Sequence, residues 1–384
     1  MLEKHADTVL LPTPNEDMCY FNGINVSRYY VLEDFMESVE AANFDFKKKV
    51  KVQFIANFGE HQDIEIAIDE GGPRREFFRL LIDAVVHTSG LLEGPETMKV
   101  FSSKVSALRR KHYYYAGYAV AASILMGGQP LCCLAPSVVD FLMNGQSNPT
   151  PEEVTDYEIR DALKELTDSK TTENMRKILD EKLELRFSLG VDKPTFLLDI
   201  ADKEDLVKDI CLSFVIHRTS ASISQFADGM EVLGLMTLMR RYTALRDLLV
   251  YNNRFEITPK RFKEACTFNF CENGSNRRPV EERLAKRFLD YVDEIYRDPR
   301  QHDEHEINLQ SLLGFITGLS RLPGVRLNGI QVNFDHEATE GSLPRANTCG
   351  FMVVLPVYES FRDKTIFCSK FDIAILYAGG MHAL

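Results

Sequence analysis

No run of this 384-residue chain reaches the roughly 18 apolar residues that a membrane-spanning helix needs. Basic residues are also scarce, because 45 Lys and Arg face 57 Asp and Glu, which leaves a formal net charge of −12. Contacts to phosphate groups require a positive surface. We therefore expect neither nucleic acid nor a membrane as a partner.

The start of the chain lacks the apolar core of a signal peptide, since Glu3, Lys4, His5 and Asp7 lie among residues 1–11. The eight cysteines show no spacing typical of a disulfide framework. Both absences favour a reducing compartment. We expect the protein in the cytoplasm, the nucleus or both.

No set of metal ligands emerges from the residue spacing. Cys266 and Cys271 have no second cysteine pair nearby, and His302 and His305 stand in the polar insert 298–308. Zinc sites normally need four converging ligands or three plus water. A loose metal site at the insert is an alternative, but a solvated loop is the preferred interpretation.

Composition predicts a soluble globular protein with two bodies. Apolar and charged residues make up 45% and 27% of the chain, and 384 residues are many for one core. Residues 1–26, with two prolines, are predicted to be a linker or extension. The Gly- and Asn-containing stretch 269–279 is predicted to be a hinge between 27–268 and 280–384.

Periodicity predicts mostly helices, with a few strands. Small residues in 113–126 indicate a buried helix that lets neighbouring backbones approach closely, and Cys132 and Cys133 are expected in the core. Residues 156–185 are polar and predict two short solvated helices. The other expected helices are 27–41, 74–89, 206–217, 223–249, 280–296 and 360–377, with further ones after Pro136 and Thr258. The expected strands are 47–57, 328–334 and 351–355.

Two short motifs could carry chemistry. Gly71-Gly72-Pro73 predicts a tight turn before a helix, and because no Gly-Lys-Ser/Thr follows, a phosphate loop is the weaker interpretation. Cys349 follows Thr348 between two Leu-Pro breaks, which predicts a loop. Spacing alone leaves open whether this thiol is reactive or simply buried.

Three sequence blocks in a fixed order resemble the HECT ubiquitin-protein ligases, and their variants resemble the cell-cycle-phase-specific branch of that family. The blocks are Asp69-Glu70-Gly71-Gly72-Pro73-Arg74-Arg75-Glu76-Phe77-Phe78, Leu312–Pro323 (LLGFITGLSRLP), and Leu343–Cys349 (LPRANTC) with Leu355–Ser360 (LPVYES). The resemblance covers about residues 28–384.

The resemblance implies an α+β, bilobal fold with a mainly helical N-lobe, a smaller α/β C-lobe and a flexible hinge. It implies a ubiquitin transferase without metal, nucleotide or organic cofactor. Cys349 would accept ubiquitin as a thioester from a charged conjugating enzyme and pass it to a lysine of a protein substrate. Arg345 and Thr348 would support the thiolate or hold the ubiquitin tail.

This chain departs from the family pattern at several points. Asn347 stands where His is frequent, Gly350 where Asn is frequent, and Met381 where many members have Phe. The region that docks the conjugating enzyme, about 156–209, is short and lacks a strand hairpin pattern. These departures leave two alternatives open: a catalytically weak or inactive scaffold, and a thiol hydrolase that pairs a cysteine with His112, His217 or His336.

Overall fold

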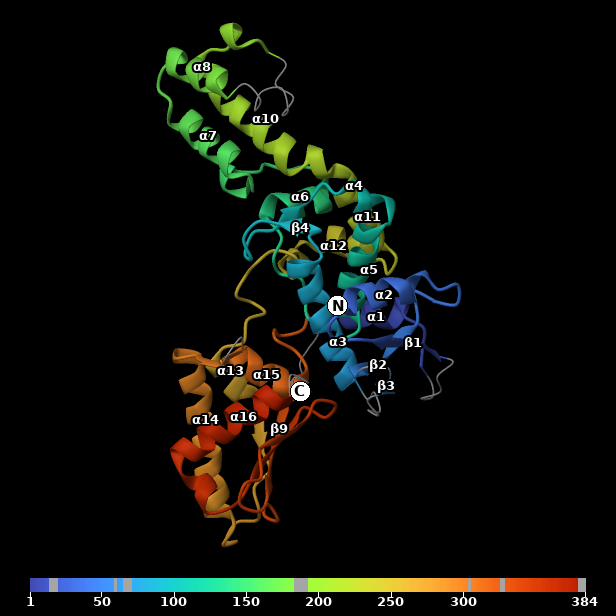
Figure 1. Ribbon diagram of the computed structural model, residues 1–384, viewed down its shortest axis with the longest axis vertical. Helices are drawn as coiled ribbons and strands as arrows, with labels where there is room; N and C mark the ends of the chain where they lie inside the picture. Colours follow the sequence, from blue (N-terminus) through green and yellow to red (C-terminus); the bar gives the residue numbers. More distant parts are fainter. Residues whose placement is uncertain are drawn as a thin grey trace.

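The computed structural model describes residues 1–13, 20–58, 61–64, 71–182, 193–302, 305–324 and 329–378. Helices dominate, and the strands form small separate sheets, so the chain has the expected α+β fold (Figure 1). Among the described residues, no helix combines the length and the apolar content needed to cross a bilayer.

The buried apolar side chains fall into two clusters that follow each other along the chain. The first runs from Leu2 to Phe255 and the second from Ile257 to Ile375. We call the two bodies the N-terminal unit and the C-terminal unit. The division lies before residues 257–268, which we had placed in the first body.

The segment predicted to be a hinge, 269–279, lies within the C-terminal unit. Phe270 stacks on Phe268 and Phe334, with ring centroids 5.6 Å apart in each pair. The Asn269 N–H donates to the carbonyl of Val332 at 2.9 Å. Aromatic packing thus holds the start of this segment against the sheet, and the hinge between the units stays a prediction.

The N-terminal unit begins with a small sheet and the helices that cover it. Its order is α1 (Leu2–Val9), β1 (Phe21–Val26), α2 (Val31–Glu40), β2 (Lys49–Phe58), β3 (His61–Ile64), α3 (Gly72–Asp83), a π-helical turn (Ala84–Thr88), β4 (Leu92–Glu93), β5 (Val100–Phe101), α4 (Val105–Arg109), α5 (His112–Leu125) and α6 (Pro136–Asn144). Strand β2 pairs in parallel with β1 and antiparallel with β3. As predicted, Val50, Val52 and Phe54 point to the buried side of β2.

The described part of residues 1–26, which we predicted to be a linker or extension, packs on the N-terminal unit. Helix α1 buries Leu2 and Ala6, and Leu10 follows them into the first cluster. The spacing of four residues puts all three on one helical face. His5 Nε2 also lies 2.8 Å from the carbonyl oxygen of Leu233.

The predicted buried helix is confirmed as α5, and it crosses α11 (Ser220–Glu231) at very short range. A Cβ on Gly117 would lie 2.0 Å from the carbonyl oxygen of Phe226, and one on Gly229 would lie 1.9 Å from that of Tyr114. Two glycines therefore permit this backbone contact. Cys132 and Cys133 are buried as expected.

Helices α7 (Tyr157–Asp168), α8 (Thr172–Glu181) and α10 (Lys203–Val215) form an arm that projects from the rest of the molecule (Figure 1). The described residues between 157 and 215 contain no strand. Helix α12 (Leu235–Arg241) follows α11. We predicted a single helix over 223–249, but Gly234, at φ +66°, interrupts it.

The C-terminal unit packs helices around a four-stranded sheet in the order β10-β11-β9-β6. Its elements are α13 (Pro259–Ala265), β6 (Cys266–Phe268), α14 (Arg278–Arg297), β7 (Arg300–His302), β8 (His305–Ile307), α15 (Leu309–Thr317), β9 (Ile330–Asp335), β10 (Arg345–Asn347), β11 (Met352–Pro356) and α16 (Lys364–Ala378). The polar insert predicted as a loop forms the β7–β8 hairpin.

The chain contacts the N-terminal unit again after α15. The N–H of Leu322 donates to the carbonyl of Phe255 at 2.8 Å, and the Ser320 hydroxyl donates to the Gln129 side chain at 2.8 Å. Gly324 packs so closely that a Cβ there would lie 2.9 Å from Leu248. Residues 319–324 thus form a second attachment between the units.

Candidate functional site

Cys349 lies in the tight turn between β10 and β11. The Oδ1 of Asn347 accepts hydrogen bonds from the N–H groups of Cys349 at 3.0 Å and Gly350 at 3.2 Å. Phe351 then adopts φ +51°, which is costly for a side chain of this size, and its carbonyl accepts the N–H of Gln331 at 2.8 Å. The turn is therefore fixed on both sides of the thiol.

Arg75, at the start of α3, reaches this turn from the N-terminal unit. Its guanidinium donates to the carbonyl oxygen of Thr348, and more weakly to that of Cys349 at 3.4 Å. The same group donates to the carbonyl of Thr317 at 3.0 Å and lies 4.4 Å from the centre of the Phe351 ring. One cation thus holds the end of α15 and the cysteine turn together.

Gly72 provides the close approach that this contact needs. A Cβ at Gly72 would lie 2.1 Å from Thr348 Oγ1 and 3.0 Å from Cys349 Sγ. No real Cβ tolerates the first distance, so any other residue here would force the Thr348 side chain to rotate or the turn to shift. The sequence predicted a turn and a helix start at this position, and both are present.

The second sequence block packs on the first. Gly318 ends α15 at φ +79°, and a Cβ there would lie 3.1 Å from the N of Glu76 and 3.3 Å from the carbonyl oxygen of Gly72. Glu76 in turn pairs with Arg28 at 2.8 Å. The described parts of the three blocks, distant in sequence, therefore meet around the Cys349 turn.

A cleft of about 610 Å³ opens at this junction. Pro73 and Glu76 line it from α3, Phe315 from α15, and Thr348 and Cys349 from the turn. The Cys349 side chain is half-buried, so a thiol faces a groove that both units build.

The two supporting residues predicted from sequence take different positions. Thr348 lines the cleft beside Gly72. Arg345 does not line the cleft. Its side chain is largely exposed, and its guanidinium pairs with Asp335 at 2.7 Å. Its support of the thiol stays a prediction. The sequence did not identify Arg75 as a site residue. Its motif was recognised, but the residues that its guanidinium contacts lie more than 240 positions later in the chain.

The other described thiols are poorly suited to nucleophilic chemistry. Burial raises the pKa of Cys132, Cys133, Cys211 and Cys266 to about 12. Burial also raises the pKa of Cys368, and a hydrogen bond to the Glu281 carboxylate raises that of Cys271. A thiol with a raised pKa holds little thiolate near neutral pH.

None of the described residues that line the Cys349 cleft is a histidine. His112 begins α5, where burial lowers its pKa, and His217 lies in a 3₁₀ turn after α10. His336 pairs with Glu281, at 2.7 Å. Among the described residues, therefore, no histidine in this cleft is available to pair with Cys349 as the hydrolase alternative requires.

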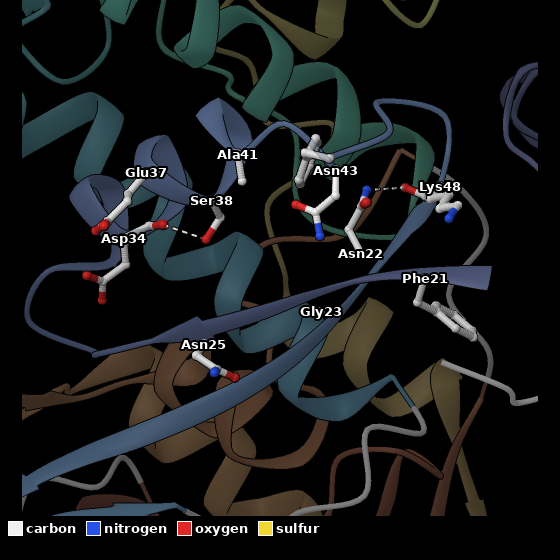
Figure 2. A pocket seen from close by; sticks show the side chains of 11 residues that line it. Phe21, Asn22, Gly23, Asn25, Asp34, Glu37, Ser38, Ala41, Asn43 and Lys48 are labelled. Atoms are coloured by element: carbon white, nitrogen blue, oxygen red, sulfur yellow. Dashed lines mark hydrogen bonds between the residues drawn. The ribbon is translucent and has the colours of Figure 1, made fainter. Parts of the chain in front are cut away.

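A second hollow, of about 560 Å³, lies between β1 and α2 (Figure 2). Two of its polar side chains are bonded locally: Asn22 donates to the carbonyls of Asp45 at 2.7 Å and Lys48 at 3.4 Å, and Ser38 donates to that of Asp34 at 2.7 Å. Among the described residues, no cysteine or histidine lines this hollow.

Several sequence-based expectations fall outside the described residues. These are the first two residues of the opening motif, Asp69 and Glu70, the segment 183–192 within the docking region, and Met381 near the chain end.

Comparison with known proteins agrees with the geometry. The family model described as HECT-domain (ubiquitin-transferase) matches residues 79–384. Two curated proteins, both named G2/M phase-specific E3 ubiquitin-protein ligase, are similar to this chain. The chicken protein is 24% identical over 305 residues, which are 77% of this chain and 38% of the relative. The human protein is 20% identical over 343 residues, 88% of this chain and 45% of the relative. The chain spans less than half the length of these relatives, and it belongs to the HECT ubiquitin-transferase family.

Proposed function

We propose that Cys349 accepts ubiquitin as a thioester from a charged conjugating enzyme and transfers it to a lysine of a protein substrate. The observation that carries the proposal is the junction at which Gly72 and Arg75 hold a half-buried cysteine in a cleft shared by two units. Family membership supplies the reaction class.

The chemistry needs two exchanges at one carbonyl carbon. The Cys349 thiolate attacks the thioester between ubiquitin and the conjugating enzyme, a new C–S bond forms, and the enzyme's thiolate leaves and takes up a proton. A neutral lysine amine then attacks the Cys349 thioester, an isopeptide bond forms, the Cys349 thiolate leaves, and the amine loses a proton to solvent. The first step exchanges one thiol for another and is near balance, so it needs no strong general base.

The cysteine turn contributes position more than proton transfer. The N–H groups of Cys349 and Gly350 are bonded to Asn347, and Arg75 is bonded to backbone carbonyls on the same side. These contacts hold the thiol at the mouth of the cleft, where the extended tail of ubiquitin would lie. Accurate placement of two reacting groups is itself a large rate factor.

The arm is the surface on which we place the conjugating enzyme. Its 3₁₀ turn Thr195–Leu197 exposes 72% of Phe196 and 55% of Leu197. Exposed large apolar side chains next to each other are typical of protein interfaces. The region at about 156–209, which the family resemblance marks as the docking region, thus offers exposed apolar side chains on a helical arm.

A charging assay tests the proposal. The chain is mixed with ubiquitin-charged conjugating enzymes, and a ubiquitin adduct that reductant releases is sought on non-reducing gels. We expect the adduct in the native chain and in Cys368→Ala, a matched control at another half-buried thiol. We expect none in Cys349→Ala.

An adduct that persists in Cys349→Ala would place the acceptor elsewhere and overturn the proposal. Absence of any adduct with a folded native chain, across a panel of conjugating enzymes, would favour the inactive scaffold instead. Release of free ubiquitin without an adduct or transfer would favour a hydrolase.

A further inference from the structure

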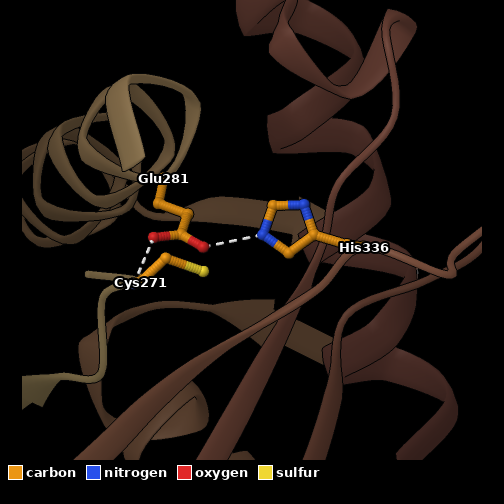
Figure 3. Close-up of side chains that lie close together, drawn as sticks. All are labelled: Cys271, Glu281 and His336. Carbon is orange, nitrogen blue, oxygen red and sulfur yellow. Dashed lines mark hydrogen bonds and ion pairs between the residues drawn. The ribbon is translucent and has the colours of Figure 1, made fainter. Parts of the chain in front are cut away.

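Three side chains that can bind metal meet on the C-terminal unit, outside the Cys349 cleft. They are Cys271 in the loop after β6, Glu281 in the first turn of α14, and His336 immediately after β9 (Figure 3). One ligand atom of each lies within 4.8 Å of those of the other two. Sequence spacing could not reveal the group, because the three come from separate elements.

The carboxylate of Glu281 stands at the centre of this cluster. Its Oε1 lies 2.7 Å from His336 Nε2, and its Oε2 accepts the backbone N–H of Cys271 at 2.8 Å. The side chain of Glu281 is 1% exposed and that of His336 16%. Burial of a carboxylate costs considerable free energy unless the group is paired or coordinates a metal.

The order of contacts excludes a nucleophilic triad. In such a triad the histidine lies between the thiol and the acid. Here Glu281 lies between the other two, with its Oε1 beside His336 Nε2 and its Oε2 on the backbone N–H of Cys271. The Nε2 of His336 is therefore bonded to the acid.

The surroundings hold the ligands in place. Phe270 is stacked on both sides, which fixes the residue before Cys271. Arg278 donates to the carbonyl of Cys271 at 2.8 Å, so the loop is also tied to the start of α14. Preorganised ligands on packed elements are what a specific metal site requires.

We propose that Cys271, Glu281 and His336 form a binding site for Zn²⁺, with a fourth position open to water or to a group from a partner. One thiolate, one imidazole and one carboxylate suit zinc, whereas Mg²⁺ and Ca²⁺ prefer all-oxygen shells. Two anionic ligands also neutralise the charge of the ion, which favours a partly buried site.

The geometry needs only small shifts to admit the ion. Zinc bonds of about 2.0–2.3 Å in a tetrahedron place ligand atoms about 3.3–3.7 Å apart. The Glu281 and His336 atoms, now 2.7 Å apart, would separate by less than an ångström, and the thiol would move inward after losing its proton. The metal would then link the β6–α14 loop, α14 and the end of β9.

Metal titration of the full-length chain tests the site without ubiquitin or a conjugating enzyme. Zn²⁺ is titrated against a chromophoric chelator, and Co²⁺ serves as a spectroscopic probe because a thiolate ligand gives it a charge-transfer band. We expect one tight Zn²⁺ per chain and the cobalt–thiolate band. Zn²⁺ should also raise the thermal midpoint.

The variants Cys271→Ser and His336→Asn should weaken binding by about 100-fold or more, because loss of outer-shell partners alone costs 10–100-fold. Cys271→Ser should also abolish the cobalt–thiolate band. The matched controls Cys368→Ser and His302→Gln change the same residue types elsewhere on this unit and should bind like the native chain. Unaltered binding in both site variants, or no zinc retained by the native chain against the chelator, would overturn the proposal.

Discussion

The carbonyl oxygen of Thr348 accepts a hydrogen bond from the guanidinium of Arg75, which lies 273 residues earlier in the chain. The contact joins the residue next to the candidate acceptor cysteine to the first turn of a helix in the other unit. The same guanidinium also holds the carbonyl of Thr317. Arg75 is therefore a positioning residue for the turn that carries Cys349.

Replacing Arg75 with Ala should slow formation of the ubiquitin adduct by about tenfold or more. A hydrogen bond to a charged group contributes about 1.5–3 kcal/mol, and about 1.4 kcal/mol corresponds to a factor of ten in rate. The lower rate of adduct formation should persist when the charged conjugating enzyme is present at a saturating concentration. Arg75→Lys should recover part of the rate, because it keeps the charge but not the planar fork.

The control for Arg75 is Arg246→Ala, which removes another half-buried arginine with a 2.8 Å ion pair, to Asp140. Equal loss of rate in both variants would indicate a general effect on stability and would contradict a positioning role.

Gly72→Ala should displace the cysteine turn without unfolding the chain. The added Cβ would meet Thr348 Oγ1 at 2.1 Å and lie 3.0 Å from Cys349 Sγ, so the side chains of the turn must rotate or the turn must move away. We expect slower adduct formation together with faster alkylation of Cys349, measured by mass spectrometry of the modified peptide. Gly314→Ala is the control, since outside its own helix the atom nearest to a Cβ there, the carbonyl oxygen of Leu319, is 3.8 Å away. Unchanged kinetics in Gly72→Ala would show that the turn does not need this contact.

Asn347→Ala should loosen the turn, because two N–H groups lose their acceptor. The expected decrease in the free energy of unfolding is about 1 kcal/mol. Asn347→Asp keeps the acceptor and should restore stability, but its negative charge beside Cys349 should slow adduct formation at neutral pH. Denaturant unfolding and charging kinetics separate the two effects. Equal stability of the Ala variant and the native chain would contradict the capping role.

Phe196→Ala should raise the concentration of charged conjugating enzyme needed for half-maximal adduct formation, by about tenfold, as expected for an interface anchor. The maximal rate should stay close to that of the native chain, because Phe196 lies on the arm and not in the cleft. Tyr296→Ala, at a side chain 53% exposed on α14, is the control. A fall in the maximal rate alone would argue against docking at this surface.

Alkaline pH should destabilise the N-terminal unit through its buried thiols. The folded-state pKa of Cys133 is raised by burial from about 9 to about 12. A group with a raised folded pKa contributes stability that is present below its unfolded pKa and is lost as pH rises toward the folded value. The free energy of unfolding should therefore fall between about pH 9 and 12, and less steeply in Cys133→Ala. Identical pH profiles for the two chains would contradict this.

Sequence alone was sufficient for the elements whose pattern is local. The alternation Val50, Val52, Phe54 predicted β2, and the small residues of 113–126 predicted the close helix crossing that Gly117 and Gly229 permit. The family resemblance, which rests on three short blocks, agrees with the family-model match over residues 79–384.

Features that depend on contacts across the chain were missed. The short stripe Leu2, Ala6, Leu10 was overlooked beside two prolines, and it forms α1 because a partner surface is available. The glycine and asparagines of 269–279 suggested a hinge, and the stacking of Phe270 within this segment could not be predicted from the sequence pattern. Arg345, next to the cysteine in sequence, pairs with Asp335, whereas Arg75 reaches the turn from far away. Sequence proximity was a poor guide to which arginine contacts the turn.

Residues 319–324 return to the N-terminal unit after the chain has already left it at Phe255. The hydrogen bonds of Arg75 to Thr317 and Thr348, and the close approach of Gly72 to Thr348, join the same two units elsewhere. A rigid body held at several separated places cannot turn while all of them persist. Any movement of the C-terminal unit as a whole therefore requires the Arg75, Ser320–Gln129 and Leu322–Phe255 hydrogen bonds to break first.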